Sequence, residues 1–178
     1  DPAPTGPAPT DPAPTAPAPR EAVARGDHPA GADTGPGRPW FEDAFGPLYL
    51  DLYPHRDRDE ADRALAMLAG VIGPALDAGP VLDIACGSGR YLEALHARRT
   101  PAVGLDLSRP LLTRAAEEVG ATLVRGDMRH LPFRGGAFAV ALSMFTSLGY
   151  FASPADDALV LAEAARVVRP GGHFVLDY

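Results

Sequence analysis

A regular alternation of short apolar runs with helical stretches, in the second half of the chain, most constrains its fold. Residues 80–85 are predicted as a buried strand, residues 90–97 as a helix, and "PAVGLDLS" as a second strand that ends near Asp106. Aspartates end or follow three predicted strands, with 23 residues from Asp83 to Asp106 and 21 from Asp106 to Asp127. Each interval fits one short strand, one helix and two tight turns, which predicts parallel βαβ units.

Further elements follow from the same patterns. Ser108 is placed to cap a helix that runs to about Val119, and "ATLVRGD" and "FAVALSMF" are predicted as the third and fourth strands. An earlier stretch, "RDEADRALAMLAGVIGPAL", has acidic residues at its start and apolar residues near helical spacing. These apolar positions are Ala61, Leu65, Leu68 and Ile72. This stretch is predicted to form an amphipathic helix that leads into the core.

The last predicted helix lies in "SPADDALVLAEAARVV". Ser153, Pro154 and Asp156 match a helix cap, a first-turn proline and a capping-box acid. We expect "RPGG" to end this helix and "HFVLDY" to begin a fifth strand. Strands that alternate with helices in this way predict an α/β fold with a doubly wound, mostly parallel sheet.

The start of the chain has a different composition. Residues 1–20 contain eight prolines and five alanines, and "DPAPTGPAP" recurs almost unchanged as "DPAPTAPAP". Such a segment has few large apolar side chains to offset the entropy lost on ordering. We therefore expect residues 1–39 to be a disordered tail or linker, and residues 40–178 to form one domain that starts at the aromatic cluster "WFEDAF".

Composition excludes several function classes. The formal net charge of −7 argues against a binder of nucleic-acid backbones, which relies on clustered Lys and Arg. A single cysteine, Cys86, rules out an internal disulfide framework and suggests no metal cluster, which fits a cytoplasmic protein. Cys86 itself is expected to fill a tight turn as a small residue. The sequence contains no apolar run of membrane-spanning length.

The turn in "VLDIACGSGRY" raises the question of a ligand. A strand that enters a glycine turn and leaves as a helix presents unpaired backbone N–H groups to any ligand that the glycines admit. Two ligands fit this description at first, the pyrophosphate of a dinucleotide and the amino-acid end of S-adenosylmethionine. The third glycine of a GxGxxG motif is absent, since that position is Leu92.

The aspartates favour S-adenosylmethionine. In an open parallel sheet the ligand lies beyond the carboxyl ends of the strands, where Asp83, Asp106 and Asp127 are expected. A dinucleotide site tolerates one acid on a ribose, but a carboxylate beside a pyrophosphate is repelled. S-adenosylmethionine presents an ammonium, a sulfonium, ribose hydroxyls and an adenine amino group, all of which attract or donate to carboxylates. An NAD(P)-dependent oxidoreductase therefore remains the alternative rather than the leading hypothesis.

A set of motifs in a fixed order strengthens this hypothesis. "VLDIACGSGR", "VGLDLS", "VRGDMRHLPF", "LSMFTSLGYF" and "VVRPGGHFVLDY" resemble the successive motifs of class I S-adenosylmethionine-dependent methyltransferases. "WFEDAFGPLYLDLYPHRD" resembles the opening of a bacterial small-molecule branch of that family, so the resemblance covers roughly residues 40–178. It implies a Rossmann-like fold, S-adenosyl-L-methionine as cofactor and methyl transfer to a small-molecule acceptor.

The resemblance also implies nine cofactor-binding positions, all at or after the first four strands. They are Asp83, Ala85, Gly87 and Gly89 for the methionine moiety, Asp106 for the ribose, Leu107 and Met128 against the adenine, Asp127 for the adenine amino group, and Ser143 for the floor of the site. No catalytic residue is predicted firmly, because methyl transfer needs a base only when the acceptor must first lose a proton. His55 is the best-placed candidate.

The chain departs from the family pattern at three places. Ala85 replaces the usual first glycine, and Ala139 stands where an aspartate often precedes the fourth strand. Family members also continue past the fifth strand, so we expect a domain that lacks its C-terminal strands and exposes a strand edge. A non-catalytic truncated fragment is therefore a further alternative to an active enzyme.

Overall fold

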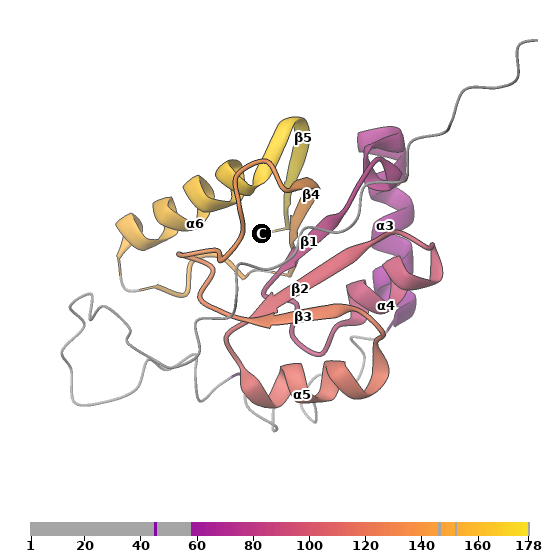
Figure 1. Cartoon of the computed structure of the whole chain (residues 1–178), viewed down its shortest axis with the longest axis horizontal. Helices are drawn as coiled ribbons and strands as arrows, with labels where there is room; N and C mark the ends of the chain where they lie inside the picture. The colour runs from indigo at the N-terminus through magenta and orange to yellow at the C-terminus, as the bar shows by residue number, and fades with distance from the viewer. Residues whose placement is uncertain (1–44, 46–57, 146, 152, 178) are drawn as a thin grey trace, which may run out of the picture.

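The computed structural model describes residue 45, residues 58–145, residues 147–151 and residues 153–177. The predicted tail over residues 1–39, its boundary with the domain and His55 lie outside the described residues, and they stay predictions. The described residues form one five-stranded sheet with helices on both faces (Figure 1). This architecture confirms the predicted α/β fold.

The sheet is parallel throughout its described strands. In spatial order these are β3 (Thr122–Arg125), β2 (Ala102–Asp106), β1 (Val81–Ile84), β4 (Phe138–Ser143) and β5 (Val168–Leu176). The chain builds outward from β1 to β3 and then returns to the other side of β1. The strand order therefore reverses between β1 and β4, which is where α/β sheets form ligand crevices beyond their carboxyl ends.

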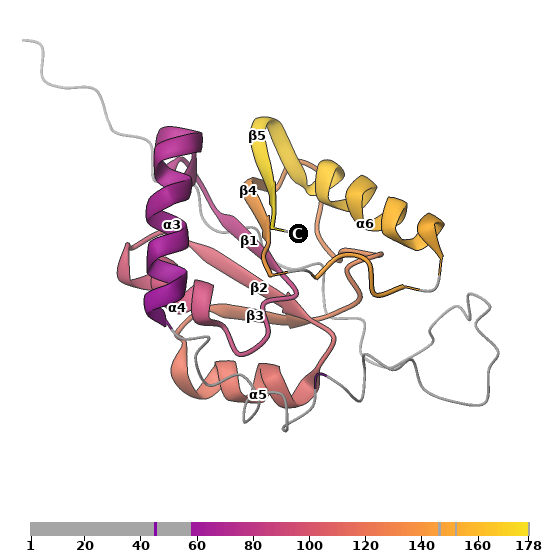
Figure 2. The ribbon, with the colours of Figure 1, turned by 180° about the vertical axis from the view of Figure 1, so that it is seen from behind.

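The helices divide between the two faces of the sheet. α3 (Arg58–Ile72), α4 (Arg90–Ala97) and α5 (Arg109–Glu118) cover one face, and α6 (Pro154–Val167) covers the other. Figures 1 and 2 show α6 separated from α3 and α4 by the strands. The helix caps explain two of the starts, since Ser108 accepts a hydrogen bond from Leu111 N and Ser153 accepts one from Ala155 N.

The first predicted helix is shorter than its sequence pattern suggested. Ala61, Leu65 and Leu68 are buried as predicted, but α3 ends at Ile72. Gly73 adopts a left-handed φ of 57° and Pro74 cannot donate a backbone hydrogen bond, so the chain continues as a short 3-10 helix, η1 (Gly73–Asp77).

The expected start of the fifth strand is wrong. We predicted that "RPGG" would separate the helix from the strand, but β5 begins directly after α6. The pairing passes from Phe138 opposite Val168 to Val140 opposite His173, so two steps on β4 correspond to five on β5. The glycines therefore lie in an irregularity within the strand. Gly171 has a φ of 75°, and a Cβ on Gly172 would lie 2.5 Å from the carbonyl oxygen of Ala139.

One glycine in the sheet determines how closely α4 approaches. A Cβ on Gly104 of β2 would lie 2.5 Å from Leu92 Cδ1 and 2.8 Å from Cys86 Sγ. The absent side chain therefore lets the glycine turn and the first part of α4 pack directly on β2. Gly104 lies opposite Asp83 in the register, so this close packing also encloses the Asp83 side chain.

Three further features of the described residues are the sheet edge, the character of the helices and the grouping of metal-binding side chains. β5 is an edge strand of the described sheet, as expected, and β3 is the edge strand on the other side. Within the described residues, no helix combines the length and apolar character needed to cross a membrane. Those residues also hold no group of three His, Cys, Asp or Glu side chains suited to a metal ion.

Candidate cofactor-binding site

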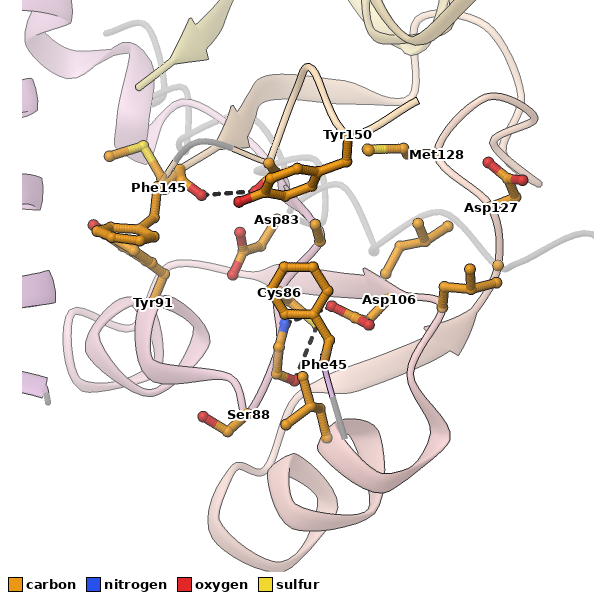
Figure 3. A pocket seen from close by; sticks show the side chains of 18 of the residues that line it. Phe45, Asp83, Cys86, Ser88, Tyr91, Asp106, Asp127, Met128, Phe145 and Tyr150 are labelled. Carbon is orange, nitrogen blue, oxygen red and sulfur yellow. Dashed lines mark hydrogen bonds between the residues drawn. The ribbon is translucent and has the colours of Figure 1, made fainter. Parts of the chain in front are cut away.

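A cavity of about 160 Å³ opens beyond the carboxyl ends of β1 to β4 (Figure 3). Seven of the nine predicted cofactor-binding residues line it, and two do not. The seven are Asp83, Ala85, Gly87, Asp106, Leu107, Asp127 and Met128. The structure therefore brings together residues that are up to 45 positions apart, from Asp83 to Met128, around one cavity.

The glycine turn is held in a left-handed conformation at three positions. Ala85, Gly87 and Gly89 have φ angles of 58°, 56° and 88°. Gly87 N donates to Asp106 Oδ2 at 2.8 Å, and Cys86 N donates to the Leu105 carbonyl at 3.0 Å. The turn is therefore fastened to β2. Ala85, which replaces the family glycine, is accommodated at the cost of an unfavourable backbone conformation.

Gly89 has a packing role in the structure and does not line the cavity. It caps α4, and a Cβ there would lie 3.1 Å from Val119 Cγ2 and 3.2 Å from Ala115 Cβ. The glycine thus allows α4 to start against α5. Ser143, the other predicted residue outside the cavity lining, is the last residue of β4 and is 1% exposed. Its Oγ has no hydrogen-bond partner among the described residues.

Asp83 is the most unusual side chain in the cavity. It is 1% exposed, and its Oδ2 has no hydrogen-bond partner among the described residues. Burial and the nearby Asp106 raise the pKa of this carboxyl to about 8, and Arg90 opposes the rise. A buried carboxyl oxygen without a hydrogen-bond partner costs stability, and a cationic ligand would remove that cost.

Asp106 ends β2 and joins two turns. Its Oδ2 accepts from Gly87 N, and its Oδ1 accepts from Ser108 N at 2.7 Å. Burial raises the pKa of this carboxyl, although the backbone hydrogen bonds from Ser108, Gly87 and Leu107 oppose the rise. Each carboxylate oxygen has two lone pairs, so both oxygens retain acceptor capacity for ligand hydroxyls.

Asp127 has a partner that the sequence analysis missed. Its two oxygens accept hydrogen bonds from the Arg129 side chain, the shortest at 2.7 Å, and Oδ1 also accepts from Arg129 N at 2.9 Å. Burial raises the pKa of Asp127, but the hydrogen bonds from Arg129 outweigh it and the pKa lies below its usual range. The guanidinium also pairs with Asp156 on α6 and lies 4.6 Å from the Phe151 ring centre.

Aromatic side chains enclose the rest of the cavity. Phe45 and Tyr150 both line it, with ring centres 5.4 Å apart, and Ser108 Oγ donates to the Phe45 carbonyl at 2.7 Å. In Figure 3, Tyr91 and Phe145 lie on the side of the cavity away from Asp127, and Met128 lies on the side of Asp127. The sequence suggested neither Phe45 nor Tyr91, because an aromatic residue near a motif is as typical of a core as of a site.

Cys86 fills the glycine turn as a small buried residue, as predicted. The thiol is 6% exposed and lies in the glycine turn. Burial raises its pKa well above the usual value, and Asp83 and Asp106 raise it further. The side chain is therefore a neutral thiol that fills the turn, and not a nucleophilic thiolate.

Comparison with known proteins identifies the family. A family model described as a methyltransferase domain matches residues 81–172, so the chain belongs to this methyltransferase family. Over 131 residues it is 34% identical to the dTDP-3-amino-3,4,6-trideoxy-alpha-D-glucopyranose N,N-dimethyltransferase of Streptomyces venezuelae, covering 73% of this chain and 55% of that protein. It is also 35% identical over 132 residues to a phthiotriol/phenolphthiotriol dimycocerosates methyltransferase of Mycobacterium tuberculosis, covering 70% and 47%.

Solved structures agree with this family. The crystal structure of Streptomyces venezuelae DesVI matches with a TM-score of 0.62 and 32% identity, over 72% of this chain and 54% of that one. CalS10, an amino pentose methyltransferase from Micromonospora echinaspora solved with S-adenosylmethionine bound, matches with a TM-score of 0.62 and 30% identity, over 72% and 55%. The prediction of S-adenosylmethionine as cofactor is confirmed, and the NAD(P) alternative is set aside. The chain spans about half the length of the curated relatives that it matches.

Proposed function

We propose that this chain is the cofactor-binding part of a methyltransferase that transfers a methyl group from S-adenosylmethionine to a small-molecule acceptor. The observation that carries the proposal is the buried carboxyl of Asp83, which lines the cavity and has an oxygen without a partner among the described residues. The cofactor's ammonium would supply the missing donors and the missing positive charge.

The other lining residues fit the remaining parts of the cofactor. Asp106 would accept hydrogen bonds from the ribose hydroxyls with the acceptor capacity left by Gly87 and Ser108. Leu107 and Met128 would pack against the adenine, and Asp127 would accept from its amino group. Ala85, Gly87 and Gly89 set the backbone of the turn. Ser143 ends β4 outside the cavity lining, and its role as the floor of the site remains a proposal.

Positioning is the contribution that we assign to the protein. When bound, S-adenosylmethionine supplies a methyl group that the adjacent sulfonium activates. The residues of the cavity would hold the donor in one orientation and exclude water, and alignment of this kind can contribute up to about 7–11 kcal/mol to lowering a barrier. No base is required if the acceptor is a neutral amine. His55 stays a candidate base only for an acceptor that must lose a proton.

We propose an amino group on a small polar molecule as the acceptor. Two of the relatives at 30% identity or more carry names that specify N,N-dimethylation of dTDP-amino sugars, and the solved relative CalS10 is named an amino pentose methyltransferase. The net charge of −7 argues against a nucleic-acid acceptor. A cytoplasmic location for the domain over residues 40–178, with residues 1–39 as a tail, completes the proposal.

Calorimetric titration of the full chain with S-adenosylhomocysteine tests this function, with NADH as the matched control. We expect saturable heat with the first ligand and none with the second. A well-folded sample, by circular dichroism, that gives no heat with S-adenosylhomocysteine would contradict the proposal. Mass spectrometry of a dTDP-amino sugar incubated with the chain and S-adenosylmethionine then separates an active enzyme from a binding-competent but inactive fragment.

A further inference from the structure

Arg90 is the basic side chain of an otherwise acidic cavity. Among the described residues that line the cavity, three are aspartates and Arg90 is the sole Lys or Arg. Its side chain is 15% exposed and belongs to the first residue of α4, directly after the glycine turn. A partly buried cation in this position is unexpected for a site that receives a cationic donor, so it requires its own explanation.

The guanidinium of Arg90 is held in place on three sides. Nη1 donates to Glu60 Oε2 of α3 at 2.7 Å. The guanidinium carbon lies 5.1 Å from the ring centre of Tyr91 and 5.3 Å from that of Phe145. Ring contacts of this kind fix the plane of an arginine and reduce the entropy lost when a ligand binds.

Hydrogen-bonding capacity remains on Arg90 after these contacts. A guanidinium carries five N–H donors, and Glu60 is its hydrogen-bond partner within the described part of the chain. Tyr91 and Phe145, the two rings beside it, both line the cavity. The remaining donors therefore belong to a group at the wall of the cavity, within reach of an acceptor that enters it.

Asp83 and Arg90 together match an amino-acid zwitterion. They lie at the two ends of the same turn, on β1 and on α4, and both line the cavity. Asp83 offers an acceptor oxygen without a partner among the described residues, and Arg90 offers charged donors. A ligand carboxylate surrounded by Asp83, Asp106 and Asp127 alone would be repelled, so its binding needs a compensating cation.

We propose that the Arg90 guanidinium binds the carboxylate of the cofactor's amino-acid end, opposite the ammonium at Asp83. This inference rests on the proposed function. It assigns to Arg90 a role in ligand recognition in addition to its ion pair with Glu60, which joins α3 to α4. The backbone N–H groups at the start of α4 would support the same negative charge.

Three ligands distinguish this role from a structural one. S-adenosylmethionine has the ammonium and the carboxylate, decarboxylated S-adenosylmethionine has the ammonium alone, and methylthioadenosine has neither. We expect Arg90→Met, which keeps the length of the side chain, to weaken calorimetric binding of S-adenosylmethionine about tenfold or more, the range for a charge-assisted hydrogen bond. Binding of the two ligands without a carboxylate should change less than about twofold. Arg90→Lys, which retains the charge, should recover part of the loss.

A matched variant on the other side of the ion pair completes the test. Glu60→Gln removes the charged partner of Arg90 and leaves the guanidinium in the cavity wall, so binding of S-adenosylmethionine should be kept or strengthened. If Arg90→Met weakens all three ligands equally, or none of them, the inference is wrong and Arg90 is structural. If the wild-type chain binds none of the three ligands, the proposed function fails and this inference fails with it.

Discussion

Asp83 and Asp127 line the same cavity from opposite ends, yet their carboxyl groups have very different surroundings. Asp127 accepts hydrogen bonds on both oxygens from Arg129, and its pKa is lowered despite its burial. Asp83 is more deeply buried, its Oδ2 has no partner among the described residues, and burial raises its pKa to about 8. One end of the cavity is thus internally satisfied and the other is not.

Asp127 is therefore a pre-organised hydrogen-bond acceptor, whereas Asp83 has an acceptor oxygen without a partner among the described residues. Arg129 fixes the Asp127 carboxylate against α6 through Asp156, so this end of the cavity is held by the folded chain alone. A donor from a ligand there adds to an existing network. At Asp83 we expect a ligand to supply the interaction that Oδ2 lacks among the described residues, and we therefore expect most of the selectivity for a cationic ligand at this end.

Substitution of Asp83 is expected to have the largest effect on ligand binding. We expect Asp83→Asn to weaken S-adenosylmethionine binding about a hundredfold above pH 8, because a charge-assisted hydrogen bond contributes about 1.5–3 kcal/mol. The same change should raise the thermal stability of the ligand-free chain, since it removes a buried acid. Calorimetry and thermal unfolding measure the two effects. Unchanged affinity would assign Asp83 a purely structural role.

Removal of the Arg129 side chain should leave the Asp127 carboxyl without its charged donors, so that it resembles that of Asp83. We expect Arg129→Ala to lower the free energy of unfolding by about 2 kcal/mol at pH 7, because it leaves Asp127 buried without its charged donors. A lowered pKa stabilises the fold above the carboxyl's unfolded value of 3.8, so this difference should shrink as the pH falls below about 4. Urea denaturation at both pH values is the measurement.

Arg114→Ala is the matched control for Arg129→Ala. Arg114 is 51% exposed and pairs with Glu117 and Glu118 within α5. Exposed pairs of this type contribute at most about 1 kcal/mol. Equal losses in the two variants would mean that the Asp127 network is no more important than a surface ion pair.

The raised pKa of Asp83 predicts that the affinity for S-adenosylmethionine depends on pH. Below pH 8 the free chain holds a proton on Asp83, which a cationic ligand must displace. Affinity for S-adenosylmethionine should therefore rise with pH up to about 8, approaching about tenfold per pH unit, and level off above it. Calorimetry in buffers of different ionisation enthalpy measures the proton released. Proton release that persists in Asp83→Asn would assign the effect to another group.

The smallest effect is expected in the turn between the two ends. Ala85 has a φ of 58°, where a residue with a Cβ is strained and glycine is not. Ala85→Gly should increase the free energy of unfolding by about 0.5 kcal/mol, because relief of strain exceeds the entropy that glycine adds to the unfolded chain. Ser88→Gly, in the same turn, is the control and should not stabilise. A loss of stability in Ala85→Gly would contradict the proposed strain.

Most of the fold followed from periodicity and helix signals. The alternation after Pro80 correctly predicted five strands and their parallel arrangement, since buried strands and capped helices have local signatures. The two errors have different causes. "RPGG" belongs to β5 in an irregular pairing with β4, where Gly172 lies close to Ala139, and this tertiary contact has no local signature. The first helix ends early at Gly73 and Pro74, which are a local signal for a helix end.

The site was predictable in part for a related reason. Acids at strand ends must gather at one edge of a parallel sheet, so the positions of Asp83, Asp106 and Asp127 followed from topology. The partners of these acids did not. Arg129 reaches Asp127 through a long side chain, whereas the Arg90 side chain in the same cavity pairs with Glu60. The direction of both side chains depends on neighbours from other elements, namely Glu60 of α3 and Asp156 of α6.

The single cysteine of the sequence gives the cavity a built-in kinetic probe. Because Cys86 is buried as a neutral thiol in the glycine turn and lines the cavity, we expect an alkylating reagent to modify it when the turn transiently opens. The labelling rate then measures the free energy of that opening. Any molecule that occupies the cavity must slow this reaction in proportion to its occupancy, whatever its own spectroscopic properties.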